Sequence, residues 1–506
     1  MASSKELFHL IQSLTTAEKA YFKKQSSFGS SALNKGYIKL FDILAGLGQY
    51  DEEIIKKKSE KFPFSNYLSK AKNQLYHSIL KTLRGFYLPN SIDLQLQEII
   101  QEVELLYNKA LISLCMNTIK KGKEIARERE RFLYYLLFMD WELRAMSWSI
   151  ENTWTEQFYE ELRTGIRLFA NYIETYESGN KVKQLLYSTD ADSRKQRESN
   201  ELIDTFLMKD VTDGFSARAQ TVILGTKFIV YMKRNQLSNM YDQKAAHLGV
   251  FEQHSFLKTD FPVAYLGALS NTALTAIELY KYKEALSFID KLEHFLSTIR
   301  ENRAFLKIKG MEFIDSLKLS LCIIKGETNN TVIQIRQVES HLSVYKTNSL
   351  FSWNECIYDI AYALFTMGEF KKSRKYIFQI VHEAEGKMNE NYLLKYKLLG
   401  AITNYELEDY DLLEHSIQQL NKFFDTPGSQ DCFEKQLLVL LRNTLEVATK
   451  SEKIKLFDKY LRSQKTDKII TRLIGIDYTT WLTAKAKNTL MSNIYLEKFK
   501  QSQNPG

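Results

Sequence analysis

The scarcity of proline constrains this chain more than any other feature. Its 506 residues include five prolines, and the 172 residues from Asn90 to Phe261 contain none. Proline breaks the interior of a helix, whereas sheet proteins need turns that are rich in proline and glycine. Only 20 glycines accompany the five prolines. The sequence therefore predicts an all-α fold.

One local pattern recurs in the apolar-periodic segments after Ser91. A small residue is followed by a tight turn, an aromatic residue and a second small residue, 12 positions after the first. Two antiparallel helices come closest at one crossing, where small residues let the backbones approach. The residues expected to pack at such crossings and turns are Ala273, Ala285, Ala361, Gly368, Phe370, Ser373, Ala401 and Tyr410.

These segments resemble tetratricopeptide-type helical hairpins. The turn and the small residue after it match best at Gly368, Phe370 and Ser373. The match is looser near Tyr280, where the turn glycine is absent, and weakest near Glu408. The resemblance implies a right-handed α-solenoid of antiparallel helical hairpins, preceded by a small N-terminal helical domain.

The spacing of the units departs from that family. Phe370 lies 88 residues after Tyr282 and 40 residues before Tyr410, whereas the family repeat is about 34 residues. A fainter copy of the pattern has its turn near Ala110. The opening stretch "LFHLIQSLTTAEKAYFKK" is also similar to that of a group of uncharacterised bacterial helical-repeat proteins, and this similarity implies no activity. We therefore expect a degenerate array with long repeats.

Breaks in the apolar periodicity, together with turn residues, divide the chain into four predicted segments. We predict a basic N-terminal helical domain at residues 1–90 and aromatic-rich helical hairpins at residues 91–260. TPR-like repeats follow at residues 261–430, and C-terminal capping helices at residues 431–500.

Positive charge is concentrated in the first of these segments. Residues 1–90 contain 14 Lys or Arg and 7 Asp or Glu, a net charge of +7, so the rest of the chain contributes only +1 of the total of +8. The stretch "NYLSKAKNQLYHSILKTLRGF" contains no acidic residue. Its apolar residues follow one face at 3–4 spacing, and Lys70, His77, Lys81 and Arg84 follow another.

This basic face has two interpretations. Together with the preceding "DEEIIKKK" segment, the helix resembles the second helix of a helix-turn-helix motif, which would read DNA. However, the connection is longer than in that motif, and its apolar packing suits any helical bundle. We favour a solvated or protein-binding face.

Signatures of catalysis and of metal binding are not found in the sequence. It contains no P-loop, no G-x-G-x-x-G and no G-x-S-x-G. His247 and His254 lie two helical turns apart, but a polar loop and helix explain them better than a metal site. The scattered cysteines indicate reduced, buried thiols in a cytoplasmic protein, although a pair brought together by folding stays open. The four cysteines are Cys115, Cys322, Cys356 and Cys432.

A non-enzymatic, cytoplasmic protein-binding scaffold is the function that the sequence favours, because stacked hairpins offer an extended surface to partner proteins. Its partner is expected to be a protein, with an acidic surface if the basic face makes the contact. The second hypothesis is a transcription-linked regulator that contacts the phosphates of a nucleic acid through residues 1–90. An enzyme is a third hypothesis, which no motif supports. We expect no cofactor, no metal and no membrane-spanning segment.

Overall fold

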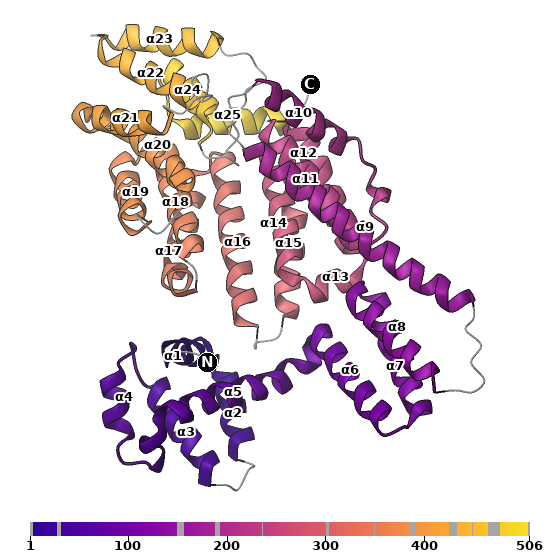
Figure 1. Ribbon diagram of the computed structural model, residues 1–506. Coiled ribbons are helices and arrows are strands. Elements are labelled where there is room, and N and C mark those ends of the chain that lie inside the picture. Colours follow the sequence, from indigo (N-terminus) through magenta and orange to yellow (C-terminus); the bar gives the residue numbers. More distant parts are fainter. Residues whose placement is uncertain are drawn as a thin grey trace. The chain divides into compact units, whose positions relative to one another are not determined.

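The computed structural model is all-helical wherever the chain is described. It describes residues 4–27, 32–148, 156–187, 193–234, 236–299, 303–348, 350–384, 390–424, 433–447, 449–463 and 476–503. These residues form 25 α-helices and contain no β-strand (Figure 1). Most of these helices pack against their neighbours in the sequence, as in an α-solenoid.

The chain forms two compact units, which are described separately. Unit 1 comprises Met1–Phe169 and Arg300–Ala304, and unit 2 comprises Ala170–Ile299 and Phe305–Gly506. The four segments predicted from the sequence do not follow this division, since the segment 91–260 includes residues of both units, and they stay a prediction.

Unit 1 contains two groups of helices, each with its own apolar core. The first group is α1 (Ser4–Ser13), α2 (Thr16–Ser27), α3 (Ala32–Ala45), α4 (Glu52–Ser59), the short 3-10 helix η1 (Pro63–Tyr67) and α5 (Leu68–Tyr87). The second group is α6 (Ile92–Asn108), α7 (Ile112–Glu128), α8 (Phe132–Met146) and the beginning of α9 (Glu156–Tyr187).

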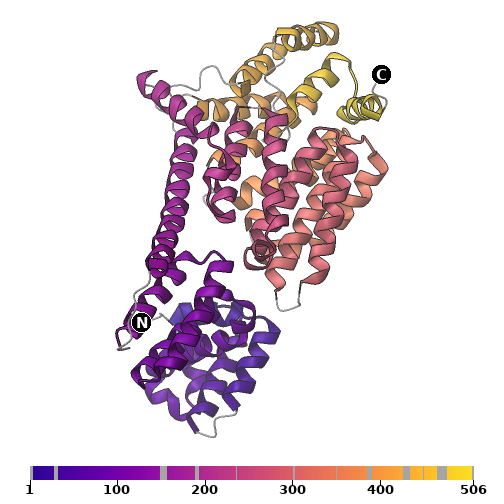
Figure 2. The same cartoon turned by 90° about the vertical axis from the view of Figure 1, so that its right-hand side faces the viewer.

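Unit 2 holds the largest apolar core of the described residues. Its first helices after α9 are α10 (Ser193–Leu207), α11 (Ala217–Lys233), α12 (Leu237–Gln253), α13 (Ser255–Asp260), α14 (Pro262–Glu278) and α15 (Tyr282–Thr298). The next six are α16 (Ala304–Ile324), α17 (Thr328–Asn348), α18 (Leu350–Thr366), α19 (Phe370–Ala384), α20 (Glu390–Glu406) and α21 (Tyr410–Phe424). The last are α22 (Phe433–Leu445), α23 (Lys450–Ser463), α24 (Tyr478–Ala486) and α25 (Met491–Gln503). Helices α14, α15 and α16 run side by side (Figure 2).

One turn geometry recurs between consecutive helices in both units. A residue with positive φ ends the first helix, and the amide of the next residue donates to the carbonyl five residues earlier, at 2.7–3.1 Å. This is the Schellman arrangement, which satisfies carbonyl groups left free at a helix end. The positive-φ residues are Ala110, Glu130, Tyr280, Gly326, Gly368, Glu408 and Asn488.

The hairpin of α18 and α19 shows how the small residues are used. Ala361 and Ser373 are both fully buried, and the Ser373 hydroxyl donates to the Ala361 carbonyl at 2.7 Å. The fainter copy in unit 1 has the same contact, because the Cys115 thiol lies 3.6 Å from the carbonyl oxygen of Val103, also 12 positions earlier. The two helices of each hairpin therefore touch at this register.

The last two helices, α24 and α25, run back across the turns of the preceding hairpins, and we call residues 478–503 the C-terminal strap (Figure 1). The ring of Phe499 lies edge-on to that of Tyr282, 4.7 Å away, at the α14–α15 turn. At the α16–α17 turn, a β-carbon on Gly326 would lie 2.6 Å from the carbonyl oxygen of Ser492. The strap thus touches the backbone of this turn directly.

Farther toward its N-terminal end, the strap meets the next two turns. A β-carbon on Gly368 would lie 2.9 Å from the side chain of Leu490. At the end of α20, the carboxylate of Glu406 accepts hydrogen bonds from the Trp481 indole at 2.7 Å and from the Lys485 ammonium at 2.8 Å. The strap therefore follows the hairpins of unit 2 in reverse order.

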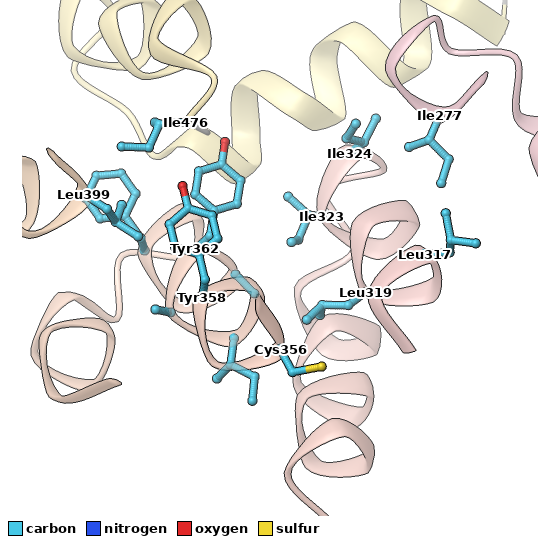
Figure 3. Packing of buried hydrophobic residues seen from close by; sticks show 14 of the residues in the cluster. Ile277, Leu317, Leu319, Ile323, Ile324, Cys356, Tyr358, Tyr362, Leu399 and Ile476 are labelled. Carbon is cyan, nitrogen blue, oxygen red and sulfur yellow. The ribbon is translucent and has the colours of Figure 1, made fainter. Parts of the chain in front are cut away.

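The core beneath the strap contains several tyrosines. Figure 3 shows Tyr358 and Tyr362 of α18 among aliphatic side chains that include Leu399 and Ile476. The hydroxyls of Tyr362 and Tyr495 are 2.8 Å apart, and both residues are buried. A polar contact thus joins the strap to the middle of the hairpin series.

Candidate functional site: the basic face of α5

Helix α5 owes its orientation to an apolar face that packs against α1, α2 and α3. Ala71, Leu75 and Ile79 on this face are fully buried. Their 3–4 spacing is that of an amphipathic helix. The opposite face of α5 consequently points to solvent.

All four residues predicted for the basic face are exposed on that opposite side. Lys70, His77, Lys81 and Arg84 lie at the surface, as does Gln74 between them. At 1.5 Å per residue the row from Lys70 to Arg84 is about 21 Å long. Within the part of the chain that is described, none of the four has a side-chain hydrogen bond or an ion pair. The row is therefore an uncompensated positive surface.

Two other exposed cations of the same helical group are paired with acids. Lys23 pairs with Asp42 at 2.7 Å and Lys56 with Glu53 at 2.9 Å, both at the surface. Exposed pairs of this kind contribute little to stability, but they neutralise charge locally. The basic face differs because no acid lies beside it on α5.

Lys72 belongs to the same acid-free stretch but has a different role. It is buried, and its ammonium pairs with Glu52 of α4 at 2.7 Å. Burial alone would raise the pKa of Glu52, but the hydrogen bonds from Lys72 and Tyr50 outweigh it and leave this pKa below its usual value. Lys72 thus connects α4 and α5 inside the fold.

Two exposed apolar side chains at the basic face are absent from the sequence-based prediction. Leu80 is 36% exposed and Tyr67, just before α5, is 40% exposed. Leu80 lies off the apolar stripe and one helical turn from His77 and Arg84. That position in the sequence was a usable signal, because a leucine on a charged face has no role in the helix's own core.

The connection between α4 and α5 argues against the DNA-reading interpretation. The 3-10 helix η1 separates α4 from α5, so the connection is not the short turn of a helix-turn-helix motif. Arg84 lies in the last turn of α5, where a cation also interacts favourably with the helix dipole.

The predicted packing residues lie in unit 2. Five of them are buried, namely Ala273, Ala285, Ala361, Ser373 and Ala401. Gly368 has a φ of +83° in its turn, and Phe370 packs partly buried against the core. Tyr410 is 38% exposed, and its ring lies 5.3 Å from the Lys453 ammonium.

Three cavities lie elsewhere among the described residues. One of about 400 Å³ lies among α7, α8 and α9, where Lys123 pairs with Glu142 at 2.6 Å and with Glu161 at 3.0 Å. Two others, of about 300 and 390 Å³, adjoin at Glu406 and Lys485 under the strap. These charged side chains pair with each other, as they do in structural contacts between helices.

His247 and His254 lie in different surroundings, and the described cysteines are free thiols. His247 lies within α12, where burial lowers its pKa to about 4, and His254 follows the end of that helix. Cys115, Cys322 and Cys356 are free thiols, and Cys432 lies outside the described residues. No three His, Cys, Asp or Glu side chains in the described ranges are placed to hold a metal ion.

Comparison of the chain with models of protein families and with curated proteins finds no match. None of the helices in the described ranges has the length and apolar character needed to cross a bilayer.

Proposed function

We propose that this chain is a non-enzymatic scaffold that binds a partner protein, and that the basic face of α5 contacts an acidic surface of that partner. One observation carries the proposal. Lys70, His77, Lys81 and Arg84 form an exposed row along one face of α5, and no acidic residue of that helix lies beside them. Complementary charge raises the rate and the specificity of protein association.

The architecture supports the proposal. We infer a right-handed array of degenerate tetratricopeptide-like hairpins in unit 2, with long repeats and the recurrent Schellman turn. Arrays of this class bind proteins along their extended surfaces. We place the protein in the cytoplasm on its scattered free cysteines.

A pull-down from native cells tests the proposed function. The full chain and its Lys81→Glu/Arg84→Glu variant are used as baits, with and without nuclease. We expect the wild type to capture a protein after nuclease treatment and the variant to lose it. A matched control, Lys57→Glu/Lys58→Glu, makes the same charge change on the exposed side of α4 and is expected to retain the protein.

Nucleic-acid binding is the competing outcome of this test. If the basic face contacts phosphates, capture disappears with nuclease, and affinity for duplex DNA falls by orders of magnitude between about 50 and 200 mM salt. Either result would contradict the scaffold proposal.

A further inference from the structure

Leu80 adds an apolar position to the charged side chains of the basic face. His77, Leu80, Lys81 and Arg84 occupy positions i, i+3, i+4 and i+7 of α5, which are neighbours on a helix surface. Such a quartet is the hole into which one side chain of a facing helix packs. Leu80 is 36% exposed and the other three are exposed, so the hole is accessible.

We propose that this hole binds an acidic amphipathic helix of a partner protein, which places one apolar side chain against Leu80 and carboxylates beside Lys81 and Arg84. The inference rests on the proposed function and specifies the chemistry of the partner.

The side chains around the hole can contact both the apolar side chain and the carboxylates of such a helix. Lys81 and Arg84 have long apolar stems that extend the surface of Leu80, while their charged ends reach solvent. Carboxylates that flank an apolar seam pair with those ends, as they do beside the seam of a coiled coil. Lys70 lies two turns before His77, so a helix lying along α5 can meet cations over about 21 Å.

A nucleic acid fits this surface less well. Duplex DNA carries about one negative charge per 1.7 Å of its axis, or about 12 over the length of the row, and the row offers four side chains. Phosphates also gain nothing from Leu80 or Tyr67. Tyrosine and arginine beside an apolar centre are instead typical of protein interfaces.

The test uses the full chain and three labelled probes, with binding measured by fluorescence anisotropy. The first probe is a synthetic helical peptide of about three heptads with leucine at a and d and glutamate at e and g. The second has glutamine in place of every glutamate, and the third is a DNA duplex of about 20 base pairs. We expect the glutamate peptide to bind most tightly and the glutamine peptide at least about tenfold more weakly.

Variants separate the contribution of the apolar contact to peptide binding from the contribution of charge. Leu80→Ala and Lys81→Glu/Arg84→Glu should each weaken binding of the glutamate peptide about tenfold or more, and Leu80→Met should restore it. The Lys57→Glu/Lys58→Glu control should bind like the wild type, and circular dichroism checks that every variant folds.

The inference is overturned if the wild type does not bind the glutamate peptide, if Leu80→Ala binds like the wild type, or if the duplex binds more tightly. In the first two cases the pull-down still decides the proposed function independently. The third outcome contradicts the proposed function as well.

Discussion

At the scale of single residues, the recurrent turn shows what glycine contributes. Among the described residues, two of the seven positive-φ turn residues are glycine, Gly326 and Gly368. Other residues lose roughly 1–2 kcal/mol in this conformation, yet Tyr280 and Glu408 adopt it with the same hydrogen bonds. The sequence pattern of a hairpin is weak at these two positions because the turn lacks a glycine. The packed helices on either side specify the turn instead.

Of the two turn glycines, Gly326 should tolerate a substitution less well. Its φ is +67° and a β-carbon would lie 2.6 Å from the Ser492 carbonyl oxygen, so Gly326→Ala adds a clash with the strap to backbone strain. We expect a loss of more than about 1 kcal/mol in the free energy of unfolding. Gly267→Ala in α14 is the matched control, because nothing lies within 4 Å of its added carbon. A thermal midpoint of Gly326→Ala equal to that of the control would contradict the described strap contact.

Lys244 should make the stability of the fold depend on pH. It is buried in α12, where it donates to the Thr275 hydroxyl at 3.0 Å, and desolvation lowers its pKa to about 8. The unfolded chain, with a pKa near 10.4, then binds more protons between about pH 8 and pH 10. Stability should therefore rise with pH in this window.

Lys244→Met isolates that contribution. We expect the variant to be more stable than the wild type at pH 7, by an amount on the order of 1–3 kcal/mol. The difference should shrink as pH rises from 8 to 10, since both proteins share every other titrating group. Urea unfolding at pH 7 and at about pH 9.5 measures it. A difference that does not depend on pH would mean that Lys244 keeps its usual pKa in the fold.

At the scale of elements, local patterns predicted hairpins and failed where packing decides. The 12-residue pairs located the α18–α19 crossing, because small side chains are required wherever two backbones approach. Polar composition alone makes residues 193–199 read as a mobile loop or a hairpin tip, but these residues lie in α10, which begins at Ser193. Its helix is held by Ile203 and Phe206, which pack with Val182 and Val230 from other helices. Such contacts are invisible in a window of sequence that contains only one of the partners.

The α18–α19 crossing can be tested by overpacking. Ala361 is fully buried, and its carbonyl accepts a hydrogen bond from Ser373 at 2.7 Å. Ala361→Leu adds three carbons where the helices touch, so we expect a loss of roughly 1–3 kcal/mol in the free energy of unfolding. Ala264→Leu, at an exposed position of α14, should change it by less than about 0.5 kcal/mol. Equal chemical denaturation midpoints for the two variants would argue against this register.

At the scale of the whole molecule, the placement of charge was readable and the long-range contacts were not. The count of cations in residues 1–90 pointed to the basic face, and its four residues lie at the surface. Leu80 lies outside the predicted face because the spacing of the basic residues alone defines that face. The strap was missed because its contacts join distant positions, such as Tyr362 and Tyr495, 133 residues apart.

The strap makes the turns of unit 2 depend on one another. Tyr495 is 1% exposed, and Tyr495→Ala should leave a cavity that costs roughly 3–5 kcal/mol. We therefore expect faster hydrogen exchange at the amides of Glu327 and Glu369, which close the turns at Gly326 and Gly368.

The control for this experiment is Leu412→Ala, at a position of α21 that is 46% exposed. It should leave exchange at both turns unchanged, and amides of α5 in unit 1 serve as an internal reference in each sample. Hydrogen exchange read by mass spectrometry separates two cases. If Tyr495→Ala lowers the thermal midpoint but the two turn amides exchange as in the wild type below it, the strap fills space without holding the hairpins. If exchange rises at both turns together, the strap couples successive hairpins into one cooperative unit, because the strap contacts both turns.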